Sequence, residues 1–404
     1  MDSAEREGLR PKGNVPNLRF PEFQGEWEEL GLSELLDFKN GLNPKPDKFG
    51  KGIKFISVMD ILNNAVITYD CIKASVDVTE KELSDFSVEK GDILFQRSSE
   101  TLEDVGRANV YMDDKTAVFG GFVIRGKKKG EYDPQYFNYL LRSPFARKRI
   151  IPMGAGAQHF NIGQEGLSKV KLHFANIEEQ KKIGKMLSLL DERIATQNKI
   201  IDKLQSLIKG ISNKLLNSKE GMLVRLGAIL KERSEKTKKN NQYAVLSSTV
   251  NGLFSQRDYF SKDIASENNV GYKIIRLHDV VLSPQNLWMG NINYNDKFDI
   301  GIVSPSYKVF LISDNYDKRY VAAMLKTHRA LYDYQLISEQ GASVVRRNLN
   351  LESFGQLVFR IPLIDKQREI GKTISLLKSR LETESMLRAA YQSQKQYLLR
   401  QMFI

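Results

Sequence analysis

The chain contains Asn176-Ile-Glu-Glu-Gln-Lys-Lys-Ile-Gly-Lys-Met-Leu-Ser-Leu-Leu190 and repeats it as Leu363-Ile-Asp-Lys-Gln-Arg-Glu-Ile-Gly-Lys-Thr-Ile-Ser-Leu-Leu377. The repeat extends upstream at the same spacing, because Asp92 falls on Asp279 just as position 176 falls on 363. Two copies of one module, each about half of the chain, explain this self-similarity better than chance does. Any fold assigned to the chain therefore has to be a duplicated one.

Each copy begins with short segments that favour β-strands and ends with a long helical pattern. From Leu30 to Phe174 the β-favouring runs are short and are separated by Gly, Asn and Asp turn signals, with one helical stretch from Pro134 to Arg147. The second copy repeats this texture from Leu226 to Phe359, with a helical piece from Tyr320 to Tyr334. Each copy is expected to form a mixed, mostly β globular unit.

A long helix is predicted after each globular unit. In both helices the apolar residues alternate steps of four and three, as in a coiled-coil seam, with a polar gap at Gln197 in the first and at Glu384 in the second. The seam residues are Ile183, Leu187, Leu190, Ile194, Ile201, Leu204, Ile208, Ile211 and Leu215, then Ile370, Ile374, Leu377, Leu381, Tyr391, Leu398 and Met402. Because one such helix cannot bury its apolar seam residues by itself, we expect the two helices to pack against each other.

These patterns predict an α+β fold in which two mostly β units are joined by an antiparallel coiled coil with pseudo-twofold symmetry. The expected boundaries are 1–175 and 219–362 for the globular units, and 176–218 and 363–404 for the helical segments. A helix of about 40 residues is roughly 60 Å long, which exceeds one turn of B-DNA, about 34 Å. The helices are therefore expected to act as a spacer between the globular units.

Composition limits the class of protein. Of 404 residues, 41% are hydrophobic and 27% charged, which is typical of a globular protein. No apolar run approaches the ~20 residues of a membrane span, and the first twelve residues lack a signal-peptide core, so we expect a cytoplasmic protein without a membrane partner. Cys71 is the only cysteine, which excludes an internal disulfide and a Cys-cluster metal site. The net charge of +12 favours a polyanionic partner such as nucleic acid.

The order of these motifs resembles the specificity subunit of type I restriction-modification systems, over nearly the whole chain from Asn14 to Ile404. The resemblance rests on Asn17-Leu-Arg-Phe-Pro-Glu-Phe23 with Trp27, on Gly91-Asp-Ile-Leu-Phe95, on Pro362, and on the paired Gln180 and Gln367. It implies two target recognition domains that each read one half of a bipartite site on double-stranded DNA. It also implies docking of two methyltransferase subunits and recruitment of restriction subunits.

Polar loops follow the strands that begin at Asp92 and Asp279. Arg suits guanine and Asn or Gln suit adenine, whereas Ser and Lys mostly position phosphates. We expect DNA contacts from Gln96, Arg97, Ser98, Ser99, Arg107 and Asn109 in the first domain and from Ser283, Gln285, Asn286, Trp288 and Asn291 in the second. For any single position the alternative is a solvated loop residue. Because the two sets differ, the domains should read different half-sites and the target should be asymmetric.

A second polar strip precedes the last strand of each unit. Its variable positions are further candidates for DNA contact, namely Gln158, His159, Arg346 and Arg347, whereas Asn161 and Asn348 match between the copies and are expected to close a structural turn. The basic stretches Lys127–Lys129 and Lys231–Lys239 could contact phosphates, although runs of charge are more often solvated surface.

The sequence lacks the motifs of an adenine methyltransferase and of a nucleotide-binding enzyme. An adenine methyltransferase would carry Asn or Asp before Pro-Pro and an aromatic residue, and no Pro-Pro pair occurs. Residues 121–128 approach a phosphate-binding loop, but Lys128 replaces the Ser or Thr that would hold Mg²⁺. We therefore expect no catalytic residue, metal or cofactor in this chain. The resemblance implies that S-adenosylmethionine, ATP and Mg²⁺ belong to the partner subunits.

Two other classes of function stay open at this point. One is a helical adaptor or scaffold that binds only proteins. The other is a duplicated enzyme that modifies DNA, against which the missing motifs count.

Overall fold

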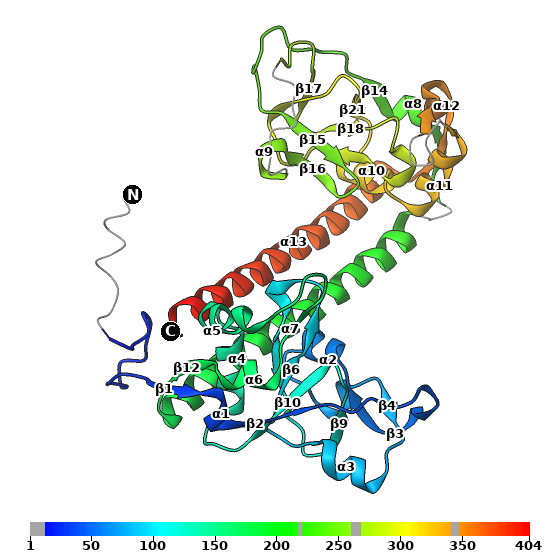
Figure 1. Ribbon diagram of the computed structural model, residues 1–404. Coiled ribbons are helices and arrows are strands. Elements are labelled where there is room, and N and C mark those ends of the chain that lie inside the picture. Colours follow the sequence, from blue (N-terminus) through cyan, green and yellow to red (C-terminus); the bar gives the residue numbers. More distant parts are fainter. Residues whose placement is uncertain (1–12, 217–219, 260–267, 341–346) are drawn as a thin grey trace. The chain divides into compact units, whose positions relative to one another are not determined.

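The computed structural model describes residues 13–216, 220–259, 268–340 and 347–404 (Figure 1). It divides into two compact units: unit 1 combines the chain up to Asn198 with Met386–Ile404, and unit 2 is Lys199–Ser385. Each of the two long helices, α7 (Ile177–Leu216) and α13 (Ile364–Gln401), contributes residues to both units. In the described part of the chain, no helix is both long and apolar enough to span a membrane.

The globular part of unit 1 alternates short strands and short helices. Its strands are β1 (Glu28–Gly31), β2 (Leu36–Asn40), β3 (Phe49–Ile56), β4 (Ser75–Val76), β5 (Ser87–Val88), β6 (Ile93–Gln96), β7 (Ser98–Ser99), β8 (Ala108–Val110), β9 (Ala117–Phe119), β10 (Val123–Lys128), β11 (Phe160–Asn161) and β12 (Lys171–Phe174). Its helices are α1 (Leu32–Leu35), α2 (Val58–Asn63), α3 (Glu80–Phe86), α4 (Pro134–Arg142), α5 (Pro144–Ile150) and α6 (Gln164–Ser168).

Unit 2 follows nearly the same order. Its strands are β13 (Met222–Arg225), β14 (Leu230–Glu232), β15 (Leu246–Thr249), β16 (Gly252–Ser255), β17 (Lys273–Arg276), β18 (Asp279–Leu282), β19 (Ile292–Tyr294), β20 (Ile300–Val303), β21 (Lys308–Ile312), β22 (Ser338–Gln340), β23 (Arg347–Leu349) and β24 (Val358–Ile361). Its helices are α8 (Leu226–Ile229), α9 (Gln256–Tyr259), α10 (Lys318–Met324), α11 (His328–Leu336) and α12 (Leu351–Gln356).

The duplication is visible in the sheet topology. Unit 1 has a four-stranded sheet in the order β2-β10-β6-β8, and unit 2 has one in the order β14-β21-β18-β19. All the pairings in these sheets are antiparallel, and Ile93 faces Gly126 as Val280 faces Phe310. A two-stranded ribbon, β1-β12 or β13-β24, accompanies each sheet. The expected fold class is confirmed: two mixed, mostly β units with two long helices.

Each expected helical stretch proves to be two helices. Ser143 ends α4 and caps α5, because its hydroxyl accepts a hydrogen bond from Ala146 N and Pro144 follows it. In unit 2, Thr327 lies between α10 and α11 and accepts from Ala330 N in the same way. Ser and Thr favour such N-caps, and proline suits the first helical turn. Helical spacing alone therefore overestimated the length of these helices.

The same polar junction joins the start of each long helix to a short helix. The Gln180 side-chain amide accepts from Asp133 N at 2.9 Å and donates to Ala175 O at 2.8 Å. Asp133 in turn caps α4 by accepting from Tyr136 N. Gly184, one turn further along α7, faces this cap: a Cβ there would lie 2.7 Å from Asp133 Oδ1 and 2.8 Å from Tyr136 N. The repeated Gln and Gly of the sequence therefore close the packing between helix and domain.

Unit 2 reproduces this junction atom for atom. Gln367 accepts from Asp317 N at 3.0 Å and donates to Pro362 O at 2.8 Å, while Asp317 caps α10 through Tyr320 N. Gly371 occupies the place of Gly184.

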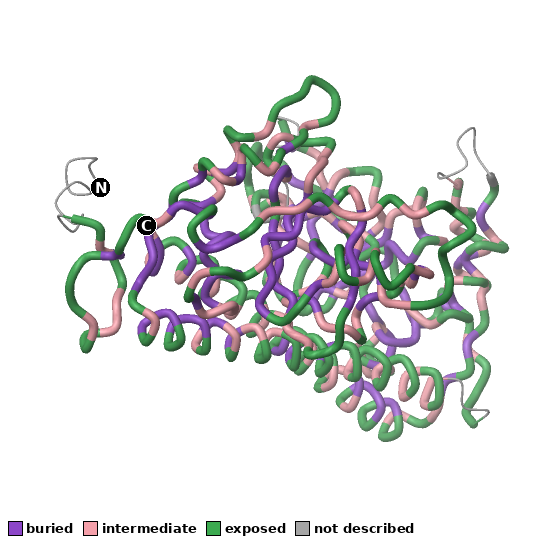
Figure 2. Tube along the Cα trace, turned by 60° about the horizontal axis from the view of Figure 1, so that its bottom comes forward, coloured by how far each residue is buried: buried purple, intermediate pink, exposed green. Residues whose placement is uncertain are grey.

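Inside unit 1 the first half of α7 packs antiparallel to the last part of α13. Asp191 forms an ion pair with Lys395 at 2.5 Å, and further along α7 the Arg193 guanidinium lies over the Tyr391 ring, which precedes Lys395 in α13. The Tyr139 hydroxyl also donates to Asp191, so this carboxylate joins α7, α13 and α4 and balances the charge of Lys395. In Figure 2 the helical turns carry many exposed residues, and buried stretches alternate with exposed ones elsewhere along the chain.

The segment before β1 packs onto unit 1. Trp27 is 3% exposed and lies edge-on to the rings of Tyr136 and Phe403, and Leu18 N donates to Gln401 O. Arg19 makes two 2.8 Å contacts with the carboxylate of Glu179, whose side chain is fully buried. This motif of the sequence therefore holds residues from both ends of the described chain in one core.

His173 in β12 predicts a pH dependence of stability. Burial, and then the charge of Arg149, lower its pKa below the ordinary value of 6.5, so the folded chain keeps the imidazole neutral. Below about pH 6.5 the unfolded chain binds this proton more readily, so folding stability should fall as pH falls through that value. Urea unfolding at pH 7.5 and 5.5 measures this loss, and His173→Gln should lose less stability between the two pH values than the parent chain. An equal loss would assign the effect to other groups.

Candidate nucleic-acid interface

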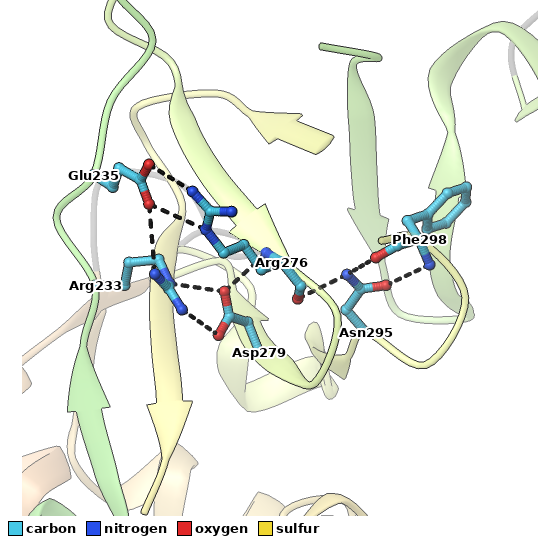
Figure 3. A network of polar contacts seen from close by, with 6 residues as sticks. All are labelled: Arg233, Glu235, Arg276, Asp279, Asn295 and Phe298. Carbon is cyan, nitrogen blue, oxygen red and sulfur yellow. Dashed lines mark hydrogen bonds and ion pairs between the residues drawn. The ribbon is translucent and has the colours of Figure 1, made fainter. Parts of the chain in front are cut away.

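The carboxylates that precede the candidate loops have a structural role. Asp92, which is 1% exposed, accepts hydrogen bonds from Glu89 N and Lys128 N. Asp279 accepts from Arg276 N at 2.8 Å and pairs with Arg233, and Glu235 joins Arg233 to Arg276 (Figure 3). Burial raises the pKa of both Asp side chains, although these N–H donors oppose the shift. The two carboxylates therefore hold the turns before β6 and β18.

Each of those turns contains one residue with a left-handed backbone conformation (positive φ). Gly91 has φ 95°, and His278, at the equivalent position, has φ 74°. A side chain in this conformation is strained, and the His278 ring stacks on Tyr294 with a 2.6 Å contact between Nδ1 and the tyrosine hydroxyl. Asn295, which is buried in the same turn, accepts from Phe298 N and donates to Arg276 O (Figure 3). The turn geometry is thus kept while its residue type changes.

In unit 1 the structure brings two of the predicted loops together. β7 pairs with β11, so that Ser98 and Ser99 face Asn161 and Phe160. The Ser98 hydroxyl donates to Asn161 Oδ1 at 2.6 Å, in agreement with the expected structural role of that asparagine. Gln158 and His159 are exposed in the loop that leads into β11. The loop after β6 and the strip before the last strand therefore form one surface.

Arg97 and Arg107 differ in their surroundings. One Arg97 N–H donates to Gly121 O at 3.3 Å, and its other guanidinium N–H groups have no partner among the described residues. Arg107 is exposed and forms an ion pair with Asp104 at 2.6 Å. Arg97 is therefore the more available of the two for an external anion or base edge.

Three predicted residues lie in the interior. Gln96 is 5% exposed, and its amide donates to Ser98 O. Asn109 is fully buried and donates to Ile61 O and Asn64 O. Asn291 is 5% exposed and exchanges hydrogen bonds with Ser248. The expectation that these amides contact DNA is corrected here, because each is committed to holding a neighbouring loop.

In unit 2 the remaining candidates also gather. Arg347 N donates to Gln285 O, and the Arg347 guanidinium lies 5.0 Å from the centre of the Trp288 ring. The exposed Gln285 lies in the same turn as the half-buried Ser283 and Asn286. The buried Asn286 Oδ1 has no hydrogen-bond partner among the described atoms. Arg346 lies outside the described residues.

The lysines of the basic stretch Lys127–Lys129 have partners within unit 1. Lys127 and Lys129 form ion pairs with Glu89 and Asp37, and the Lys128 ammonium donates to Tyr132 O. Their positive charge is therefore largely balanced within unit 1.

Sequence reasoning missed two residues of the unit 1 surface. Asn43 and Phe122 are exposed close to Arg97, but they belong to segments that the sequence patterns did not link to the loop after β6. The Gly120-Gly121 pair before Phe122 was the available signal of a tight turn.

The comparisons with known proteins agree with this architecture. Residues 24–206 match the family model described as Type I restriction modification DNA specificity domain. A putative type I restriction enzyme MjaX specificity subunit of Methanocaldococcus jannaschii is 28% identical over 207 residues, which is 50% of this chain and 48% of that protein. The MjaVIII specificity subunit of the same organism is 23% identical over 204 residues, 49% and 47% of the two chains. The match thus spans about half the length of these curated relatives.

Similarity of structure extends further than similarity of sequence. The crystal structure of the type I restriction-modification system S subunit from M. genitalium superposes with a TM-score of 0.60 at 16% identity, and covers 96% of this chain and 99% of that chain. At this identity the match shows a shared fold.

Proposed function

We propose that the whole chain is the DNA-reading subunit of a type I restriction-modification complex, because residues 24–206 match the Type I restriction modification DNA specificity domain. Unit 1 reads one half of a bipartite target and unit 2 reads the other. Two methyltransferase subunits dock on the chain, and restriction subunits join them. The target is asymmetric because the exposed side chains of the two units differ.

The observation that carries this proposal is the contrast between the two copies. The sheets share one strand order, yet the loops after β6 and β18 carry different groups, such as the half-buried Arg97 in unit 1 and the exposed Gln285 with the half-buried Trp288 in unit 2. A shared scaffold with different donors and acceptors in its loops suits two different base sequences. A scaffold that only binds proteins would not require this difference.

Reading DNA requires no chemistry from this chain. We infer that methyl transfer and cleavage belong to the partner subunits, together with S-adenosylmethionine, ATP and Mg²⁺. The test combines the purified chain with its methyltransferase subunit on a pool of random-sequence DNA, with each protein alone as control. Methylation of a bipartite motif by the pair alone supports the proposal. Modification by this chain alone supports the enzyme alternative, and a pair that forms but never selects DNA supports the scaffold.

Arg97→Ala should weaken binding of the selected DNA by about 5- to 150-fold, the effect of losing an arginine that contacts a base, and should relax selection in one half-site only. The matched control is Lys127→Ala, since Lys127 is already paired with Glu89. Fluorescence anisotropy of the complex on labelled duplex measures the affinity, and sequencing of the methylated pool measures selection. Equal effects of the two variants would remove Arg97 from the interface.

A further inference from the structure

Phe122 is a large apolar side chain on a polar surface. It is 68% exposed, more than any other large apolar residue described in the globular part of unit 1, and it follows the Gly120-Gly121 turn between β9 and β10. Burying a phenylalanine side chain is worth about 1.5–3 kcal/mol, so leaving this one in water forgoes that stabilisation. A bound partner would recover it.

The turn holds Phe122 in a fixed position. Arg97 N donates to Phe122 O at 2.9 Å, and Val123 N closes the turn on Gly120 O at 2.8 Å. A Cβ at Gly121 would overlap the Asn43 side-chain amide, and one at Gly120 would lie 2.6 Å from the Phe55 ring. The paired glycines therefore let two neighbouring segments close on the turn, and the backbone under the phenylalanine is ordered before any ligand arrives.

The neighbours of Phe122 are groups that suit nucleic acid. The Arg97 guanidinium binds Gly121 O through one N–H and keeps its other donors available, and Asn43 lies against Gly121. Directly after Arg97, strand β7 pairs with β11, and the loop that leads into β11 carries the exposed Gln158 and His159. An exposed aromatic ring on a turn that also carries an arginine with unpaired N–H donors and an amide matches the apolar wedges that enter base steps beside phosphate-binding or base-binding groups.

We propose that Phe122 is a stacking wedge that enters a base step of the half-site read by unit 1, and that Arg97 and Asn43, which both lie against the preceding Gly121, contact the same half-site. This inference rests on the proposed function. In unit 2 the same strand register puts the exposed Ser306 at the place of Phe122, and the next residue, Tyr307, is partly buried and donates its hydroxyl hydrogen to Ser248 O. Unit 2 thus presents no equivalent ring at this turn, and base unstacking at such a turn is confined to the half-site of unit 1.

The test uses the full chain with its methyltransferase subunit, bound to duplexes of the selected target that carry 2-aminopurine at single positions. Binding should raise 2-aminopurine fluorescence at one step of the half-site read by unit 1, and Phe122→Ala should abolish that rise. The same variant should weaken binding about tenfold, in the range measured for loss of one stacked base, and should leave the salt dependence unchanged because no phosphate contact is lost. Phe122→Tyr, which keeps the ring, should restore both signals.

Met59→Ala is the matched control, since Met59 is 61% exposed on α2 of the same unit and should change neither signal. If the parent complex binds no DNA, the proposed function itself fails. If it binds but fluorescence does not rise, or Phe122→Ala binds as well as the parent, the wedge is wrong and the proposed function stands. If Phe122→Ala instead releases the methyltransferase subunit, the ring belongs to a protein interface and the wedge is also wrong.

Discussion

Replacing Arg19 by alanine is expected to lower the free energy of unfolding of unit 1 by about 3–5 kcal/mol. The variant leaves the carboxylate of Glu179 buried without its two 2.8 Å contacts. Removing one partner of a buried pair costs this much because the remaining charge has lost its water and its counter-ion. The measurement is urea unfolding followed by tryptophan fluorescence in a Trp288→Phe background, so that the signal comes from Trp27 in the core of unit 1.

Two further variants separate the buried charge from loss of packing. Arg19→Ala combined with Glu179→Gln removes the stranded charge, so it should be more stable than Arg19→Ala alone. Lys182→Ala breaks an ion pair with Glu22 in which both side chains are nearly half exposed, and should cost less than about 1 kcal/mol.

Gly371→Ala is expected to destabilise unit 2 by about 1–3 kcal/mol, the usual cost of overpacking. The new methyl group would overlap Asp317 Oδ1 and lie 2.7 Å from Tyr320 N, so α13 would have to move away from the capped end of α10. Because Tyr320 N is backbone, no side-chain rotation relieves the contact. Thermal or chemical unfolding of the full chain measures the loss.

Gly210→Ala provides the matched control for this variant. Gly210 also lies inside a long helix and in unit 2, but nothing lies within 4 Å of the position of its Cβ. Alanine there should stabilise the helix by up to about 1 kcal/mol through propensity alone. Loss of stability in both variants would mean that helical glycines in this chain matter for a reason other than the junction.

The long helices and the duplication were predictable because their signals are local and periodic. The repeat also picked out Gln180 and Gln367 before any contact was known, although their bonds to Asp133 and Asp317 needed the structure. The Arg19 contact could not be predicted, since 160 residues separate it from Glu179 and one sequence gives no sign of the pairing.

The candidate site was predicted less well because residue type does not reveal which way a side chain points. Asn109 lies in a strand whose three residues are all buried, so its amide serves the interior, whereas the sequence suggested a base contact. Phe122 was overlooked for the opposite reason, since an isolated phenylalanine beside valine and isoleucine suggests a core strand. Arg97 was a candidate because arginine suits a guanine edge, and its contact with DNA stays a prediction.

The composition of unit 1 has a consequence for biosynthesis. Its core includes Leu399, Met402 and Phe403, which leave the ribosome after every residue of unit 2. The contact between Trp27 and Phe403 therefore forms only after every residue of unit 2 has been synthesised. Because domains generally fold as units as the chain emerges, unit 2 should complete its core first, and a chain truncated after Ser385 should form unit 2 while unit 1 stays unfinished.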